Sequence, residues 1–245
     1  MLRSENLFFS YGEQPLFEGL DFCLSRGVTA LLGPNGCGKS TFLKLLAGAL
    51  TPRGGELFLD GVPLKDVSAR ERVAKIAVVP QFPPPALDFS VEELVQLGLH
   101  AGEGLFMAES VEEKRKINDI LHLLELERYR NTPCSRLSGG ELQRAAVAQA
   151  LVRETPVLLL DEPAANLDPA HSIRLWEILR HLPDTPYVLI ISHDLLLAGK
   201  FADRVVLFSE GKIIADGPPR KILTAEHLAE IYAIPEEYLT FFAKK

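Results

Sequence analysis

The stretch GPNGCGKS, residues 33 to 40, decides how this chain folds. It fits the pattern G-x-x-x-x-G-K-[ST] and follows an apolar run, VTALL (28–32), that predicts a buried strand. The residues after it predict a helix, because apolar side chains recur at helical spacing at Leu43, Leu46, Ala47 and Leu50. A glycine-rich loop between a strand and a helix is typical of phosphate binding, and a purely structural turn does not account for the Lys-Ser ending.

This loop predicts a site for a nucleoside triphosphate. Backbone N–H groups from Asn35 through Ser40 can surround the β-phosphate, Lys39 can reach the β and γ oxygens, and Ser40 can bind Mg²⁺. Cys37 lies in the loop at a helix N-terminus, which is expected to lower the pKa of its thiol and suggests redox control. The alternative is that only the backbone of Cys37 takes part.

Two further apolar runs end in polar residues. The run VLLL (157–160) ends in Asp161 and Glu162, and YVLII (187–191) is followed by His193. Strands of an α/β sheet bind ligands at their carboxyl ends, so these side chains are expected at one edge. One acid can hold Mg²⁺ through water while the other orients or deprotonates the attacking water. His193 can hydrogen-bond the γ-phosphate, or it can simply begin a helix.

Two more residues are candidates by position. Gln81 ends the strand predicted from IAVV (76–79) and can offer an amide oxygen to Mg²⁺ at the hinge into the next segment. Tyr11 offers an aromatic face on which adenine can stack, or it packs on the β layer.

The pattern of elements predicts an α/β fold. Alternating apolar and polar residues over the first thirty positions predict a small antiparallel β layer, and Cys23 is expected in its core. After the prolines 83–85, the chain becomes helical, with a stripe of Ile117, Ile120, Leu121 and Leu124. We therefore expect an ATPase core with a β layer (1–81 and 156–245) and an inserted helical subdomain (82–155).

A second glycine-rich helix start is predicted in LSGGELQR, residues 137 to 144. Ser138 can cap the helix, Glu141 completes a capping box, and Gly139 and Gly140 leave backbone N–H groups uncovered. One chain thus carries two sites suited to anions.

Bulk composition excludes several classes of protein. A net charge of −7 without a long basic run argues against a nucleic-acid partner. The longest apolar runs are far shorter than the roughly 20 residues of a membrane span. Neither a secretory signal nor a disulfide or zinc pattern among the three cysteines is evident, so a reducing cytoplasm is expected.

These motifs together resemble the ATP-binding subunit of an ABC transporter, a P-loop NTPase with ATP and Mg²⁺ as its ligands. The resemblance implies catalytic roles for Lys39, Glu162 and His193, and metal contacts from Ser40, Gln81 and Asp161. It implies nucleotide contacts from Tyr11, Gly33, Pro34, Asn35, Gly36, Cys37, Gly38, Lys39, Ser40, Thr41, Gln81 and Asp161. The signature and D-loop residues would reach the nucleotide of a second copy of the chain, and these are Leu137, Ser138, Gly139, Gly140, Glu141 and Asp168.

The C-terminal half and the VEELVQLGLH segment resemble the importers of ferric siderophores, haem and cobalamin. That resemblance implies a homodimer on the cytoplasmic face of a multi-span permease, served indirectly by a solute-binding protein, with residues 82–105 docking the permease. The alternative is a soluble ABC-type ATPase of iron–sulfur assembly or another non-transport role. An exporter is disfavoured because exporters commonly fuse the cassette to a membrane domain.

Overall fold

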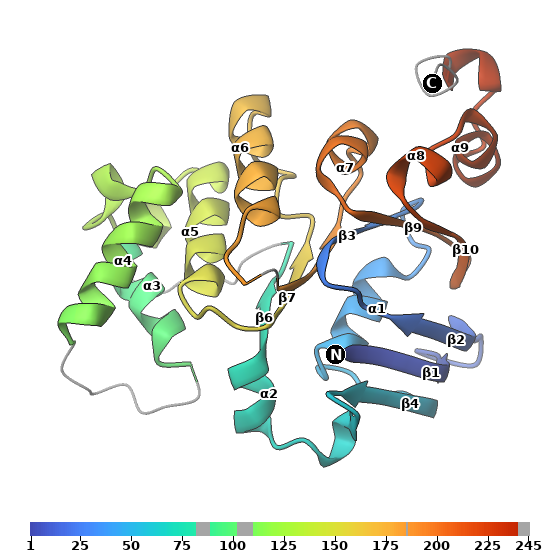
Figure 1. Cartoon of the computed structure of the whole chain (residues 1–245), viewed down its shortest axis with the longest axis horizontal. Helices are drawn as coiled ribbons and strands as arrows, with labels where there is room; N and C mark the ends of the chain where they lie inside the picture. The colour runs from blue at the N-terminus through green and yellow to red at the C-terminus, as the bar shows by residue number, and fades with distance from the viewer. Residues whose placement is uncertain (82–88, 102–109, 185, 240–245) are drawn as a thin grey trace.

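A six-stranded sheet lies at the centre of the fold (Figure 1). The computed structural model describes residues 1–81, 89–101, 110–184 and 186–239. The strands run in the order β10-β9-β3-β8-β7-β6, and all pairs are parallel except β10 with β9. Their bounds are Gly27–Leu32 (β3), Ile76–Val79 (β6), Val157–Asp161 (β7), Tyr187–Ile191 (β8), Arg204–Ser209 (β9) and Lys212–Gly217 (β10).

The first helix and a second sheet cover one face of the central sheet. That second sheet is antiparallel in the order β2-β1-β4-β5, with bounds Leu2–Phe9 (β1), Phe17–Cys23 (β2), Gly54–Leu59 (β4) and Val62–Pro63 (β5). Between the sheets lies α1 (Lys39–Leu46), whose Phe42 ring stacks on Phe208 of β9 with centroids 5.9 Å apart. This packing fixes the helix that follows the phosphate loop.

Helices cover the opposite face of the central sheet. They are α5 (Gly139–Leu151), α6 (Pro169–Arg180), α7 (Leu195–Phe201), α8 (Pro219–Ile222) and α9 (Ala225–Tyr232). Along β3, Ala30 and Leu32 pack toward these helices and Leu31 packs toward α1, as the two-residue period of a strand requires. The sheet is therefore buried on both faces, which is the usual condition of a parallel sheet.

Two more helices extend the helical layer beyond the edge of the sheet (Figure 1). They are α3 (Val91–Leu99) and α4 (Val111–Leu123), and α3 packs on α5. Each begins with the capping box that its serine predicts, Ser90 with Glu93 and Ser110 with Glu113. The predicted stripe of Ile117, Ile120, Leu121 and Leu124 is buried as expected. The limits of a separate helical subdomain, 82–155, stay a prediction.

Three local expectations differ from the structure. Helix α1 ends at Leu46, so Ala47 and Leu50 lie beyond it. Cys23 is exposed, not in the core, because the inward residues of β2 alternate and Phe22 takes the buried position. A short helix, α2 (Ala69–Lys75), has no buried residue and gave no apolar period to detect. Short 3₁₀ turns occur at Leu64–Asp66, Glu127–Tyr129, Cys134–Arg136 and Glu236–Leu239.

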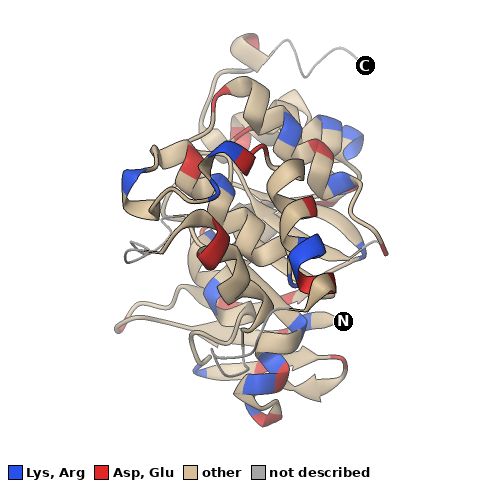
Figure 2. Ribbon diagram, turned by 90° about the vertical axis from the view of Figure 1, so that its left-hand side faces the viewer, with Lys and Arg blue, Asp and Glu red and all other residues tan. Residues whose placement is uncertain are grey.

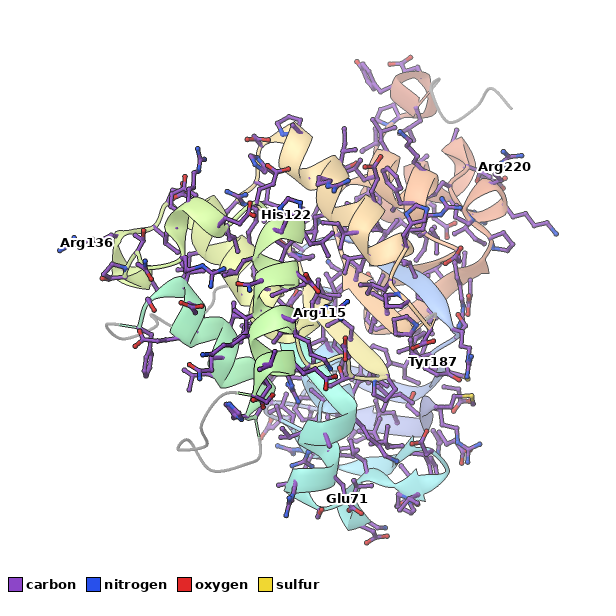
Figure 3. All side chains as sticks on the ribbon, turned by 60° about the vertical axis from the view of Figure 1, so that its left-hand side comes forward. Glu71, Arg115, His122, Arg136, Tyr187 and Arg220 are labelled. Atoms are coloured by element: carbon purple, nitrogen blue, oxygen red, sulfur yellow. The ribbon has the colours of Figure 1, made fainter. Side chains whose placement is uncertain are left out.

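Charged residues of both signs are interspersed on the face that presents α3 and α4 (Figure 2). Arg115 and His122 project from the outer side of α4 (Figure 3), and their side chains are 82% and 79% exposed. The prolines 83–85 lie outside the described residues, as do both ends of the expected permease-docking stretch, 82–88 and 102–105, whereas residues 89–101 of that stretch are described and include α3. No helix within the described ranges is long and apolar enough to cross a membrane.

Helix α3 approaches α5 so closely that a side chain does not fit at Gly98. A Cβ there would lie 2.2 Å from the carbonyl oxygen of Gln149. We expect Gly98→Ala to lower the free energy of unfolding by about 1–3 kcal/mol, because this overpacking outweighs the gain of up to ~1 kcal/mol in helix propensity. Urea unfolding followed by circular dichroism measures the change.

Gly199 on α7 is the matched control. Its Cβ would meet only the Cδ1 atom of Leu223, at 3.1 Å, and the tip of a leucine can move. Gly199→Ala should leave stability within about 1 kcal/mol of the parent. Equal losses in the two variants would contradict the close approach of α3 and α5.

Candidate functional site

The register of the parallel strands brings the predicted site residues to one edge of the sheet. Leu31 of β3 and Asp161 of β7 both pair with Ile191 of β8, and Val79 of β6 pairs with Leu160. The loops that follow these four strands therefore start side by side. They carry the phosphate loop, the acidic pair, Gln81 and His193.

The phosphate loop is held tightly between β3 and α1. A Cβ at Gly33 would lie 1.9 Å from the carbonyl oxygen of Phe208, so only glycine fits there. The Lys39 ammonium is buried and donates hydrogen bonds to the carbonyl oxygens of Gly33 at 2.8 Å and Pro34 at 2.7 Å. The loop thus supplies its own acceptors for this cation. Anionic phosphate oxygens would be stronger acceptors for the same donor.

The thiol of Cys37 does not have the environment expected of a reactive cysteine. Cys37 is buried, and burial raises the pKa of its thiol despite the nearby Lys39 ammonium. The expectation of a lowered pKa is therefore wrong, and the observation that suggested redox control is removed. The backbone of this residue is what the loop uses, since the Cys37 carbonyl accepts a hydrogen bond from Gly211 N–H at 3.2 Å.

Asp161 is poised to receive a cation. Its carboxyl is buried and burial raises its pKa, while a hydrogen bond from the Ser40 hydroxyl opposes that rise. The Oδ1 atom is buried without a hydrogen-bond partner among the described residues. A divalent cation beside Ser40 would satisfy this oxygen and favour the ionised carboxylate.

Glu162 links the two neighbouring loops. The amide of Gln81 donates to Glu162 Oε2 at 2.8 Å, and Nε2 of His193 makes a close hydrogen bond to Oε1. Glu162 has a left-handed backbone, with φ of 50°, and its N–H donates to Ile191 O at 3.0 Å. A non-glycine residue in this conformation costs free energy, which its three partners offset. Asp194 caps α7 directly after His193.

Tyr11 lies at the rim of this edge. Its side chain contacts Phe9 edge-to-face with ring centroids 5.0 Å apart, and its hydroxyl lies 3.2 Å from Thr41 Oγ1. The residue is 65% exposed, so one face of the ring is open to a planar ligand.

The second glycine-rich helix start forms as predicted. Ser138 caps α5, and its backbone N–H and hydroxyl both donate to Glu141 Oε2 at 2.8 Å. A Cβ at Gly140 would lie 2.8 Å from the carbonyl oxygen of Asn166, so the tip of α5 lies against the loop that leads to Asp168. Ser138 and Gly139 are exposed to solvent.

Three donors hold the Glu141 carboxylate. A hydrogen bond from the Tyr129 hydroxyl contributes most, followed by those from the Ser138 backbone and hydroxyl, and together they lower the pKa of Glu141 to about 2. The carboxylate therefore stays ionised at neutral pH. Asp168 caps α6 and is held in the same way by His171, whose backbone hydrogen bond is the main cause of its lowered pKa.

The predicted residues thus form two groups. The phosphate loop, Asp161, Glu162, Gln81 and His193 meet at the carboxyl edge of the sheet, while Ser138, Gly139, Gly140, Glu141 and Asp168 form the α5 tip with its neighbouring loop. Within the described residues, no hydrogen bond or ion pair joins the tip to the phosphate loop. Leu137 packs on the core behind the tip.

Sequence reasoning missed the contacts that join these residues. Neither the Gln81–Glu162 hydrogen bond nor the Tyr129–Glu141 pair is encoded in a local motif, because each joins distant segments. His171 lies between two carboxylates, a position that no motif in the sequence indicates.

Among the residues described, no group of three or more His, Cys, Asp and Glu side chains has the arrangement of a metal site. The expected magnesium site would not form such a group, because it includes a single carboxylate, that of Asp161. Its other donors are the hydroxyl of Ser40 and the amide of Gln81. The partnerless Asp161 oxygen fits this donor set.

A parallel sheet with a phosphate-binding loop after β3 and an acidic pair after β7 defines a nucleoside triphosphatase of the P-loop class. A family model described as ABC transporter matches residues 17–165. The chain belongs to the ABC transporter family, and it is one of the ATP-binding subunits of that family, which are ATPases.

Two curated relatives and one solved structure show the extent of the likeness. The chain is 36% identical to the ferric enterobactin transport ATP-binding protein of Escherichia coli K12, over 95% of this chain and 87% of that protein. It is 37% identical to the hemin import ATP-binding protein of Streptomyces coelicolor, over 92% of this chain and 81% of that protein. A dimeric bacterial ABC transporter cassette has a TM-score of 0.79 and 27% identity, over 89% of this chain and 99% of that one.

Removing the Tyr129 hydroxyl should remove one of the three hydrogen bonds that the Glu141 carboxylate accepts. We expect Tyr129→Phe to raise the pKa of the Glu141 carboxyl above its value of about 2, because the strongest of its hydrogen bonds is lost while both Ser138 donors remain. The lowered pKa stabilises the fold above the unfolded-state value and loses that effect as pH falls through about 2.

Carbon-detected NMR titration of the glutamate carboxyls measures this pKa, with Glu141→Gln assigning the signal. The Glu113 carboxyl at the α4 capping box has Ser110 donors, and its titration should not change in Tyr129→Phe. An unchanged Glu141 titration would show that the tyrosine hydroxyl does not hold the carboxylate.

Proposed function

We propose that this chain hydrolyses ATP as the nucleotide-binding subunit of an importer for a metal chelate such as a ferric siderophore or haem. The observation that carries the hydrolytic part is the Glu162 carboxylate, held between Gln81 and His193 at the edge where the phosphate loop opens. The substrate class rests on the relatives, since the curated proteins above transport ferric enterobactin and hemin by name.

In this proposal the phosphate loop binds the triphosphate through backbone N–H groups. Lys39 exchanges its bonds to the Gly33 and Pro34 carbonyls for β and γ phosphate oxygens, and Tyr11 stacks on the base. Mg²⁺ held by Ser40, Gln81 and, through water, Asp161 would neutralise phosphate charge. Glu162 then polarises the attacking water, and His193 stabilises charge on the γ-phosphoryl group.

The hydrogen bond between Gln81 and Glu162 gives the site a resting state. The hydrogen bond from the Gln81 amide nitrogen fixes the orientation of that amide and takes one of the acceptor positions on Glu162 Oε2. Binding of the nucleotide would separate the two side chains. Gln81 lies directly before the segment of chain that leads into α3. This exchange of hydrogen bonds therefore couples nucleotide binding to the helical layer.

The exposed tip of α5 would complete the site of a second copy. Its uncovered N–H groups suit an anion, yet its own phosphate loop has no bond to it among the described residues. In a head-to-tail dimer, each tip would contact the γ-phosphate bound by its twin. ATP then stabilises the dimer by mass action, and hydrolysis loosens it.

The partners follow from this assignment. The dimer would lie on the cytoplasmic face of a multi-span permease, with the solute-binding protein acting on the other side and no nucleic acid involved. The relatives support an import subunit over the soluble ATPase of iron–sulfur assembly. Co-purification with a multi-span membrane protein tests that distinction.

Replacing Glu162 tests the hydrolytic role. We expect Glu162→Gln to lower kcat by roughly 100-fold or more, because the amide cannot accept a proton from water, while ATP still binds. A phosphate-release assay measures turnover, and size-exclusion chromatography should show an ATP-dependent dimer that persists. Glu230→Gln, an exposed change on α9, serves as the control. Unchanged turnover in Glu162→Gln would contradict the role.

A further inference from the structure

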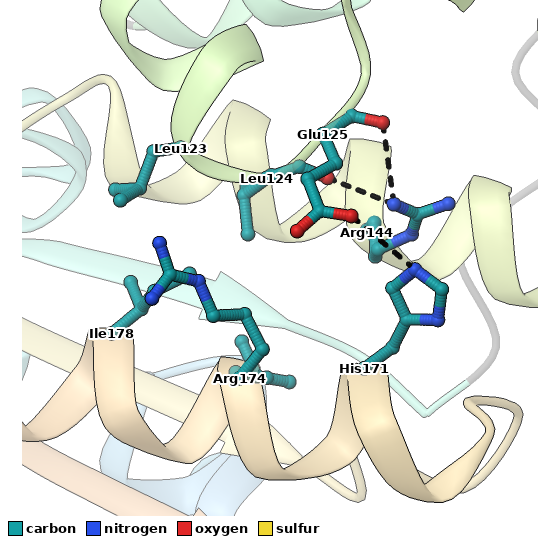
Figure 4. A pocket seen from close by; sticks show the side chains of 8 residues that line it. Leu123, Leu124, Glu125, Arg144, His171, Arg174 and Ile178 are labelled. Carbon is teal, nitrogen blue, oxygen red and sulfur yellow. Dashed lines mark hydrogen bonds and ion pairs between the residues drawn. The ribbon is translucent and has the colours of Figure 1, made fainter.

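His171 lies between carboxylates from two different parts of the fold, and Figure 4 shows the one that belongs to Glu125. Its Nδ1 atom is 2.7 Å from Asp168 Oδ2, at the start of its own helix α6. Its Nε2 atom is 3.7 Å from Glu125 Oε2, in the turn that follows α4. The ring therefore bridges the start of α6 and the turn that follows α4.

Only the protonated ring satisfies both neighbours. An imidazolium has two N–H groups and attracts both carboxylates. A neutral ring protonated at Nδ1 keeps its bond to Asp168 but presents a lone pair to the Glu125 carboxylate, which repels it. The bridge thus depends on a proton that an ordinary imidazole loses near neutral pH.

The turn that contains Glu125 is also hydrogen-bonded to α5, the signature helix, whose N-terminal tip carries the signature residues. Arg144 of α5 is buried, and its guanidinium donates to the backbone oxygens of Leu124 at 2.9 Å and Glu125 at 3.3 Å (Figure 4). These two bonds make the turn and α5 move together. A contact that fixes the turn therefore also fixes the helix whose tip carries Ser138 and Gly139.

The other end of the bridge is the loop that leads into α6. Asp168 ends this loop and caps the helix, with its Oδ1 atom accepting from the His171 N–H at 2.9 Å. Asn166 in the same loop lies against Gly140 at the tip of α5. The tip and the loop are thus joined twice, once directly and once through His171, Glu125 and Arg144.

We propose that His171, as an imidazolium, is a positioning residue that locks the signature helix to the loop ending at Asp168, so that ATP-dependent pairing of two copies weakens when the ring loses its proton. This inference rests on the proposed function, because that function assigns the tip to the partner's nucleotide. It adds a dependence on pH that comes from His171 alone.

The charges around the ring set the sign of that dependence. Asp168 and Glu125 face it and favour the cation. Arg144 faces the backbone of the turn, and Arg174, one turn further along α6, directs its guanidinium away from His171 (Figure 4). The bridge therefore stabilises the protein only while the ring carries both protons, and this stabilisation is lost when the ring is deprotonated.

The first experiment asks whether the bridge exists in the chain without nucleotide. Unfolding of the parent, His171→Gln, Glu125→Gln and the double variant forms a double-mutant cycle at about pH 6 and about pH 8.5, on either side of the ordinary imidazole pKa. We expect a coupling between the two side chains at the lower pH that vanishes at the higher pH. Absence of coupling at both values would contradict the bridge without bearing on the proposed function.

The second experiment measures ATP-dependent pairing in the Glu162→Gln background by analytical ultracentrifugation at the same two pH values. We expect the dimer Kd to rise at least about fivefold on going to the higher pH. His171→Gln and Glu125→Gln should lose that rise and pair weakly throughout, whereas His171→Arg, a permanent cation, should pair tightly at both values. Glu125→Gln leaves α6 untouched, so it separates the bridge from any local effect on the helix cap.

His181→Gln on the same helix is the matched control. His181 caps the C-terminus of α6, its Nδ1 atom lies 2.8 Å from the carbonyl oxygen of Glu177, and the variant should keep the parental dependence on pH. His193 is present in every variant, so any effect that pH has through it is common to all of them and cancels in the comparison. Equal dependence in the parent and in His171→Gln would overturn the proposal, and no ATP-dependent pairing at either pH would contradict the proposed function itself.

Discussion

The parallel register of four strands is the constraint on which the rest of the structure depends. Because β3, β6, β7 and β8 run in the same direction and pair nearly in step, the chain leaves each of them at the same edge of the sheet. Segments as distant as Gln81 and His193 then meet within hydrogen-bonding distance of Glu162. Burial of the sheet on both faces, by α1 on one side and by α5 to α9 on the other, holds this edge in place.

At that edge, the side chains proposed to bind the nucleotide and the cation are held by hydrogen bonds within the protein. Lys39 donates to loop carbonyls and Glu162 accepts from Gln81 and contacts His193, while the buried Oδ1 atom of Asp161 has no hydrogen-bond partner among the described residues. In the proposed function, each of these hydrogen bonds is exchanged for one to a more strongly charged group. The proposed catalytic cycle is therefore an exchange of hydrogen-bond partners at fixed positions, coupled through Gln81 to the helical layer.

Much of this could be predicted from the sequence because the decisive signals are local. A buried strand, a loop and a helix in direct succession identify the phosphate loop, and capping boxes at Ser90, Ser110 and Ser138 fix three helix starts. The apolar run 187–191 matches β8 to the residue, and the run 157–160 differs from β7 only by Asp161. The α/β class follows from these alternating segments.

What escaped prediction has a different physical origin. Helix α2 has no buried face, although Ser68 and Glu71 form a capping box that could have revealed it. Cys23 lies on the exposed side of β2. The two-residue period of the strand assigns the buried position to Phe22 instead. The thiol of Cys37 responds to burial more than to the helix N-terminus. The positions of His171 and Tyr129 depend on tertiary contacts, which no spacing in the sequence contains.

The central claim is that each ATP lies between the phosphate loop of one copy and the α5 tip of its twin. The most direct measurement is ATPase activity after mixing two inactive variants, Lys39→Ala and Ser138→Arg. In a mixed dimer with the proposed arrangement, one site carries both defects and the other carries none, so mixing should restore activity. If loop and tip instead served the same copy's nucleotide, every site would be defective, and a mixture as inactive as its components would contradict the account.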